Sequence, residues 1–406
     1  MRGILRDEMG FDGVLISDWA AIEETIYHGY CADKEDAAIR AVEAGVDIDM
    51  MTGIYCDNLC RLVREGKIPE SLVDECCMRI LELKNKLGLF ENPYKDADEE
   101  KEQQLILCKE HRELAREAAR KSFVLLKNEE QILPLDKTKK TAFIGPYVNS
   151  RNLMGSWSII GEAKDITTVE ETMAVEEAGN NVVCCQGSPM LGAEVILEGF
   201  TEENQATYTP EEEAKMLEEA LEAAKKADQV VLFIGEDRLQ SGEATSNATI
   251  QIPQIQQNLL ERVAEINENI AVVLFSGRPL DLRDVQVKAK AILEVWMPGT
   301  EGAGAITDVL YGRYNPTGKL PMSFPYCVGQ VPVHYNEYAT GRPHVEGKDK
   351  DRFRSKYLDI PNAPLYPFGY GLSYTTFTVS EVSLDKDSMK DGESIRAAVT
   401  VKNTGT

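Results

Sequence analysis

The segment PEEEAKMLEEALEAAKKADQVVLFI, residues 210–234, holds a helix pattern followed at once by a strand pattern. Residues 210–227 predict a helix, and the apolar run at 229–234 predicts a buried strand. A second helix is predicted at 254–267. Further strands are predicted along the chain, at 141–145, 181–185, 270–275 and 289–295. This alternation predicts an α/β unit with a mostly parallel sheet and helices on both faces.

The first ninety or so residues also resemble β/α units. Short strands are predicted at 13–17 and 46–50, where apolar runs stand between helix patterns. Gly45 is well placed as a C-cap for the preceding helix pattern. The helix patterns lie at 21–30, 33–45, 56–65 and 71–87. The polar stretch YKDADEEKEQQ, residues 94–104, predicts a solvated linker, and a helix is predicted near 107–121.

The C-terminal third changes character. Residues 298–374 are rich in Gly, Pro and Tyr and predict long ordered loops. From Phe377 onward apolar residues recur with a period of two, which predicts the first strands of a β-sandwich.

The composition narrows the possible partners. The 406 residues include 44 Lys and Arg against 68 Asp and Glu, a formal net charge of -24. That charge repels phosphate backbones and anionic bilayers, so we expect neither nucleic acid nor a membrane as partner. The nine cysteines do not form a disulfide framework, and no pair completes a zinc site. We therefore expect no metal and no cofactor, and cysteine usage favours a reducing compartment.

The segment VLISDW, residues 14–19, ends an apolar run with a carboxylate beside an indole. A parallel strand delivers the residues at its C-terminal end to the functional face, which makes Asp18 a candidate for chemistry. The alternative is that Asp18 caps the next helix. Trp19 is either a ligand platform or a packing residue.

A second candidate is the loop GEDRLQSGEATSNATIQIP, residues 235–253, which follows a strand. It holds Glu236, Asp237 and Glu243; the alternative is that these carboxylates are only solvated. The Gly-rich segment PGTEGAGA, residues 298–305, precedes a helix, but Glu301 within it favours a close turn over a phosphate site.

Several long motifs resemble glycoside hydrolase family 3, in particular its bacterial periplasmic-type β-glucosidases. The resemblance extends over nearly the whole chain. The motifs are LRDEMGFDGVLISDWAA, SFVLLKNEEQILPL, SGEATSNATIQIPQIQQNLL, WMPGTEGAGAITDVLYGRYNPTGKLPMSFP and LYPFGYGLSYTTF.

The resemblance implies a domain order. Residues 1–93 would be the C-terminal part of a (β/α)8 barrel, and 94–120 a linker with a lead-in helix. Residues 121–376 would form a six-stranded α/β sandwich with long loops, and 377–406 the start of a fibronectin-III-like domain. A full barrel needs ~250 residues. We therefore expect a C-terminal fragment that lacks most of the barrel and its glucose-binding residues, and that is inactive by itself.

The resemblance also implies a site and a reaction. Asp18 matches the catalytic nucleophile, Glu243 the general acid/base, and Trp19 an aromatic residue that lines the sugar subsite. Glu236 is the fallback acid/base. The implied function is an exo-acting retaining β-glucosidase that acts on a β-glucoside or oligosaccharide. Alternatives are a β-xylosidase, or a non-catalytic fragment that serves as a scaffold or contacts carbohydrate.

Three further expectations concern the aglycone preference, the oligomeric state and the location. Asn247 stands where the family carries Arg, which leaves the aglycone preference open. A homodimer is compatible with the resemblance. Cysteine usage favours the cytoplasm, but any leader would lie upstream of Met1, so a periplasmic or secreted location stays open.

Overall fold

The computed structural model describes residues 1–158, 161–175, 181–192, 208–345, 347 and 350–405. The chain divides into two compact units, Met1–Gln104 and Leu105–Thr406. Within the described residues, no helix combines the length and apolar character needed to cross a bilayer.

The second unit is built on a six-stranded sheet with the strand order β1-β6-β5-β4-β2-β3. Only β1 is antiparallel to its neighbour, and the other pairs are parallel. The predicted mostly parallel sheet is therefore confirmed, while the edge strand β1 was not predicted. The strands are β1 (Val124–Asn128), β2 (Thr141–Ile144), β3 (Val182–Cys185), β4 (Gln229–Gly235), β5 (Ile270–Phe275) and β6 (Ala291–Glu294).

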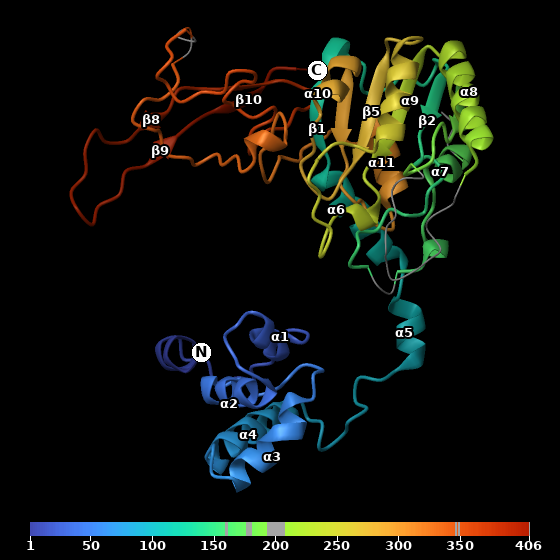
Figure 1. The fold of residues 1–406 in the computed structure, drawn as a ribbon. Helices are drawn as coiled ribbons and strands as arrows, with labels where there is room; N and C mark the ends of the chain where they lie inside the picture. Colours follow the sequence, from blue (N-terminus) through green and yellow to red (C-terminus); the bar gives the residue numbers. More distant parts are fainter. Residues whose placement is uncertain (159–160, 176–180, 193–207, 346, 348–349, 406) are drawn as a thin grey trace. The chain divides into compact units, whose positions relative to one another are not determined.

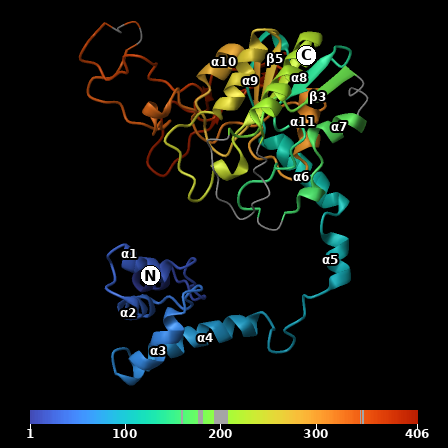
Figure 2. The ribbon, with the colours of Figure 1, turned by 45° about the vertical axis from the view of Figure 1, so that its right-hand side comes forward.

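Helices cover both faces of this sheet (Figures 1 and 2). One face carries α6 (Lys109–Ser122), α7 (Val169–Val175) and α11 (Gly302–Leu310). The other carries α8 (Pro210–Lys226), α9 (Gln254–Ala264) and α10 (Arg283–Lys288).

Strand β4 shows how the two cores are divided. Val231 and Phe233 join the cluster under α6, α7 and α11, whereas Val230, Leu232 and Ile234 join the cluster under α8 and α9. Because side chains alternate along a strand, a wholly apolar strand feeds both cores, and this explains the uninterrupted apolar run in the sequence.

The first unit consists mainly of helices around a smaller core. They are a π-helical segment (Arg2–Glu8), α1 (Ala21–Tyr27), α2 (Lys34–Ala44), α3 (Ile54–Arg64) and α4 (Glu70–Lys86). The core includes Ala38, Val42 and Leu62, which are wholly buried. Gly45 ends α2 with φ 87°, so the predicted glycine C-cap is confirmed.

Two strand predictions were wrong. The strands expected at 13–17 and 46–50 reduce to one parallel bridge between Ile16 and Ile48. Each segment finds a partner at a single point only, and a ladder needs successive pairs. The stretch 94–104, for which a solvated linker is predicted, is exposed and contains most of a helix, α5 (Glu99–Leu105). Asp98 Oδ1 accepts a hydrogen bond from Lys101 N at 3.0 Å, which caps the start of that helix.

The end of the chain forms two exposed two-stranded antiparallel ladders. The first pairs β7 (Phe377–Val379) with β10 (Val401–Asn403), and the second pairs β8 (Ser383–Leu384) with β9 (Ala397–Ala398). Strands therefore do follow Phe377, as the period of two predicted.

Candidate active site

Asp18 lies near the end of the segment 14–19, which hydrogen bonds of its backbone hold in place. Ser17 N donates to Ile48 O at 3.0 Å, and Met50 N donates to Ser17 Oγ at 2.9 Å. The Asp18 side chain is exposed, and its Oδ1 accepts from Trp19 N at 2.8 Å. The N-cap of α1 is Ala20, which has φ 56° and no side-chain cap. The alternative that Asp18 caps this helix is therefore wrong.

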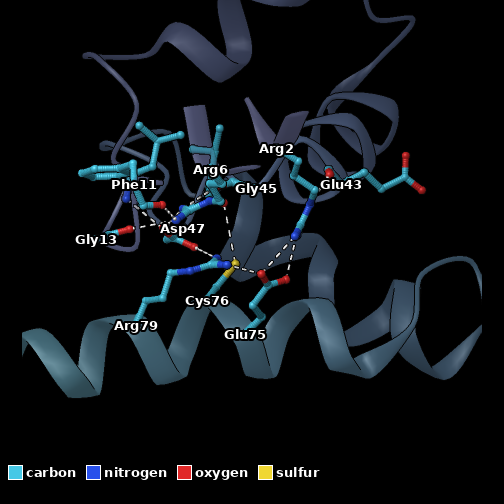
Figure 3. A network of polar contacts seen from close by, with 12 residues as sticks. Arg2, Arg6, Phe11, Gly13, Glu43, Gly45, Asp47, Glu75, Cys76 and Arg79 are labelled. Carbon is cyan, nitrogen blue, oxygen red and sulfur yellow. Dashed lines mark hydrogen bonds and ion pairs between the residues drawn. The ribbon is translucent and has the colours of Figure 1, made fainter. Parts of the chain in front are cut away.

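A buried charge network lies beside this segment (Figure 3). The Asp47 side chain has no exposed surface; its Oδ2 accepts from Leu15 N at 2.8 Å and pairs with Arg6 at 2.8 Å. Its Oδ1 pairs with Arg79 of α4 at 2.8 Å. A buried carboxylate with two guanidinium partners is held tightly. Asp47 therefore fixes the backbone three residues before Asp18.

Trp19 is 64% exposed within the first unit. The exposed indole and the exposed Asp18 carboxylate are adjacent in sequence, and the segment that carries them is anchored. An apolar ring face beside a carboxylate suits a sugar, because the C–H face of a pyranose packs on aromatic rings.

The second candidate loop follows β4 in the other unit. Glu236 and Asp237 come directly after the strand and are 1% and 4% exposed. Asp237 Oδ1 accepts from Leu239 N at 2.9 Å, and its Oδ2 accepts from the Asn152 amide at 2.8 Å. Asp237 thus caps the short helical turn Arg238–Gln240. Burial raises the pKa of Asp237, and the Leu239 N–H opposes that rise.

Glu236 forms an internal ion pair, with Oε1 3.1 Å from Arg278 Nε. Burial raises the pKa of Glu236 to about 7, against the opposing effect of Arg278. Glu243 differs from Glu236 and Asp237, the other two acidic candidates in the loop, because its side chain is exposed.

The turn around Glu243 has an unusual backbone. The residue before it, Gly242, has φ 114°, and the residue after it, Ala244, has φ 57°. A non-glycine residue in the left-handed region is uncommon and concentrates at functional sites. The structure thus presents the Glu243 carboxylate on a constrained turn.

The candidates fall into two groups. Asp18 and Trp19 lie together on the first unit, and Glu236, Asp237 and Glu243 lie on one loop of the second. Among the residues that the structure describes, no group of three or more His, Cys, Asp or Glu side chains is arranged to hold a metal ion.

Family models match both units. The model of the glycosyl hydrolase family 3 C-terminal domain matches residues 123–374, and that of the N-terminal domain matches residues 1–83. The chain belongs to glycosyl hydrolase family 3.

Individual relatives agree with this assignment. A periplasmic beta-glucosidase of Salmonella typhimurium is 42% identical over 413 residues, covering 100% of this chain and 54% of the relative. A beta-xylosidase of Formosa agariphila is 34% identical over 420 residues, with the same coverage. The crystal structure of a beta-glucosidase from Listeria innocua with isofagomine superposes with a TM-score of 0.89 at 41% identity, covering 99% of this chain and 53% of that one. The chain therefore spans about half the length of these relatives.

The family assignment confirms the resemblance and includes both candidate loops. The matched N-terminal range contains Asp18, and the matched C-terminal range contains Glu243.

Sequence reasoning missed a third buried carboxyl group, Glu294, in addition to Glu236 and Asp237 of the loop 235–253. Glu294 ends β6 and has no exposed surface; it accepts from Trp296 N at 2.8 Å and from Ser276 Oγ at 3.2 Å. Burial raises its pKa well above the usual range. The sequence contained a signal for this group, because Glu294 is a single acidic residue in the apolar run AILEV. An interior strand rarely tolerates an acidic residue that has no hydrogen-bond partners.

Sequence reasoning also missed an exposed indole near Glu243. Ser156 Oγ occupies the space that a Cβ at Gly242 would need, so the 155–158 segment packs on the Glu243 turn. The next residue, Trp157, is 67% exposed. A large exposed aromatic residue beside a candidate acid is a signal for a ligand contact.

Proposed function

We propose that the protein containing this chain is an exo-acting retaining β-glucosidase that removes terminal non-reducing β-D-glucosyl residues by double displacement. One observation carries the proposal. Relatives from Salmonella typhimurium and Listeria innocua, both named beta-glucosidases, match the chain from end to end at 41–42% identity. Another Listeria structure is of a mutant in complex with laminaribiose, a β-linked disaccharide of glucose.

In this proposal Asp18 is the nucleophile. Its carboxylate attacks the anomeric carbon and forms a covalent glycosyl-enzyme, while the bond from that carbon to the aglycone oxygen breaks. A nucleophile must be held in line with the carbon it attacks. The bridge at Ile16 and the Asp47 network provide such support for the backbone before Asp18.

Glu243 is the general acid and then the general base. It donates a proton to the departing aglycone oxygen, and it later removes a proton from the water that releases glucose. Retaining enzymes place the nucleophile and the acid/base about 5–5.5 Å apart. Trp19 would line the subsite for the glucosyl ring.

Glu236 is less suited to this role, although it stays the fallback. It is 1% exposed and its carboxylate is paired with Arg278, whereas Glu243 is exposed. A general acid must come within hydrogen-bond distance of the substrate oxygen. A carboxyl group that is enclosed by its own domain cannot do so without rearrangement.

We also propose the domain identities that the family suggests. Residues 1–93 would complete a (β/α)8 barrel, 94–120 would link it to the α/β sandwich at 121–376, and 377–406 would begin a fibronectin-III-like domain. The two exposed ladders after Phe377 support the last assignment.

A β-xylosidase is the second candidate, because the Formosa agariphila relative of that name is 34% identical over the whole chain. Comparing kcat/KM for 4-nitrophenyl β-glucoside and β-xyloside separates the two. A clear preference for the xyloside would reverse the assignment of substrate while leaving the site unchanged.

The central test uses protein expressed from the complete gene. We expect Asp18→Asn to lower kcat/KM on an aryl β-glucoside by 10³-fold or more, on the order of what a lost nucleophile costs. We expect Glu243→Gln to lower it by roughly 10²–10⁴-fold when the leaving group is poor. Full activity in Asp18→Asn would refute the enzyme assignment. If Glu236→Gln lost acid catalysis and Glu243→Gln did not, the acid/base would be Glu236.

A further inference from the structure

Arg278 touches the loop of Glu243 on both sides of the candidate acid. This arginine follows β5 in the motif Ser-Gly-Arg-Pro. Its Nη2 donates to the Thr245 carbonyl oxygen at 2.8 Å and also to the Gln240 carbonyl oxygen. One guanidinium nitrogen thus joins two backbone oxygens that flank the segment 241–244, which bears Glu243.

The Arg278 guanidinium also forms an ion pair with the buried Glu236. Its Nε lies 3.1 Å from Oε1 of Glu236, and the two side chains are 21% and 1% exposed. An ion pair so far removed from solvent is weakly screened, and the planar guanidinium fixes the direction of its N–H groups. Glu236 therefore orients Arg278 so that Nη2 points at the loop.

The loop needs such support because its backbone is strained. Ala244 has φ 57°, and left-handed backbone is unfavourable at a residue with a Cβ; Gly242 also has positive φ, which glycine tolerates. Two neighbouring contacts help to hold the turn. Thr245 Oγ1 donates to the Gly242 carbonyl at 2.7 Å, and Ser241 fills the space where Gly277 has no side chain.

We infer that Arg278, oriented by the buried Glu236, is a positioning residue that holds the Glu243 turn in the shape required for proton transfer. The inference rests on the proposed function, in which Glu243 protonates the leaving group. It also gives Glu236 a role: this carboxylate acts through Arg278 and does not touch the substrate.

The test exploits the leaving group. Acid assistance matters greatly for an alkyl glucoside, whose leaving alkoxide is strongly basic, and little for 2,4-dinitrophenyl β-glucoside, whose phenolate leaves unaided. For both substrates kcat/KM reports the steps up to cleavage of the glycosidic bond. A variant that only misplaces the acid should therefore lose kcat/KM selectively, whereas a variant that is partly unfolded loses it equally on both substrates.

The variants are Arg278→Ala, Arg278→Lys and Glu236→Gln in the protein from the complete gene. The matched control is Arg262→Ala, because Arg262 lies on α9, is 48% exposed and pairs with the exposed Glu265. For Arg278→Ala we expect a loss on the order of 10²-fold on octyl β-glucoside and less than about 5-fold on the dinitrophenyl glucoside. Glu236→Gln should show a smaller loss with the same selectivity, and Arg262→Ala no loss.

Arg278→Lys tests whether the loop requires the planar guanidinium or only a positive charge. An ammonium group is a point donor on a flexible stem and does not reproduce the fixed fork. We expect this variant to remain selectively impaired on the alkyl glucoside, whereas full activity would show that a positive charge alone suffices and would overturn the inference.

The outcomes separate this inference from the proposed function. If Glu243→Gln shows the leaving-group dependence and Arg278→Ala and Glu236→Gln do not, the positioning role is wrong and the acid assignment stands. If Glu243→Gln shows no such dependence, the acid assignment itself is wrong. Should Arg278→Ala not fold, Glu236→Gln decides, because it keeps the shape of the buried side chain; equal losses on the two substrates would then refute the inference.

Discussion

Replacing Asp47 by alanine should destabilise the first unit by about 4 kcal/mol. The Asp47 carboxylate has no exposed surface and two guanidinium partners, Arg6 and Arg79, whose side chains are 8% and 15% exposed. Removing one member of a buried ion pair costs about 3–5 kcal/mol because the other charges lose their partner. The part-buried N–H of Leu15 also loses its acceptor, which costs about 1 kcal/mol.

Two retained contacts keep the expected loss of unfolding free energy at about 4 kcal/mol, the middle of the range for a broken buried ion pair. Arg6 retains its 3.0 Å hydrogen bond to the Gly13 carbonyl, and Arg79 retains its ion pair with Glu75. Native-state hydrogen exchange followed by mass spectrometry can measure the effect within each unit. About 4 kcal/mol corresponds to roughly 10³-fold faster exchange of protected amides. Peptides covering residues 12–20 and 44–51 should show it.

The matched control is Glu65→Ala. Glu65 is 41% exposed and pairs with Arg61 and Lys67 at the surface, where solvent screens ion pairs and they contribute little to stability. Peptides from β4 and β5 in the second unit serve as an internal reference and should not change. If the two variants exchanged at the same rate over residues 12–20, the network would not hold this segment and the reasoning would be refuted.

Three further predictions concern the second unit. Since the folded pKa of Glu236, about 7, exceeds the ordinary value of 4.5, its protonated form favours the folded state, and wild-type stability should fall as pH rises from 5 to 8. Over this pH range the free energy of unfolding, measured with urea, should decrease by about 2 kcal/mol more in the wild type than in Glu236→Gln. Identical dependence of that free energy on pH in the two proteins would contradict the prediction. Asp308→Ala should cost about 3 kcal/mol, because this 6% exposed side chain accepts two hydrogen bonds from Arg116; thermal unfolding tests it, and a change in Tm below about 1 °C would disprove it. Gly277→Ala should lower kcat/KM on an alkyl glucoside more than on a dinitrophenyl glucoside, because its Cβ would overlap the Ser241 hydroxyl; equal values to wild type would argue against this packing.

The strand and helix patterns predicted most of the second unit. Apolar runs such as 229–234 and 270–275 are strands in the structure because both faces of an interior parallel strand are buried. The edge strand Val124–Asn128 escaped prediction because its apolar run gives way to Lys and Asn, and its place in the sheet depends on an antiparallel partner more than 150 residues away. The short segments around Ile16 and Ile48 were overestimated for the related reason that pairing is not local.

The sequence by itself determined the family, the αβ alternation and the carboxylates at Asp18 and Glu243 as candidates, because these depend on residue identity and on short-range periodicity. Only the tertiary structure decided that Glu236 is enclosed while Glu243 is exposed, and that Arg278 links the two. Burial and ion pairing join residues that are distant in the chain, here on the ends of neighbouring strands β4 and β5. No local pattern encodes such contacts, because they arise only when the sheet assembles.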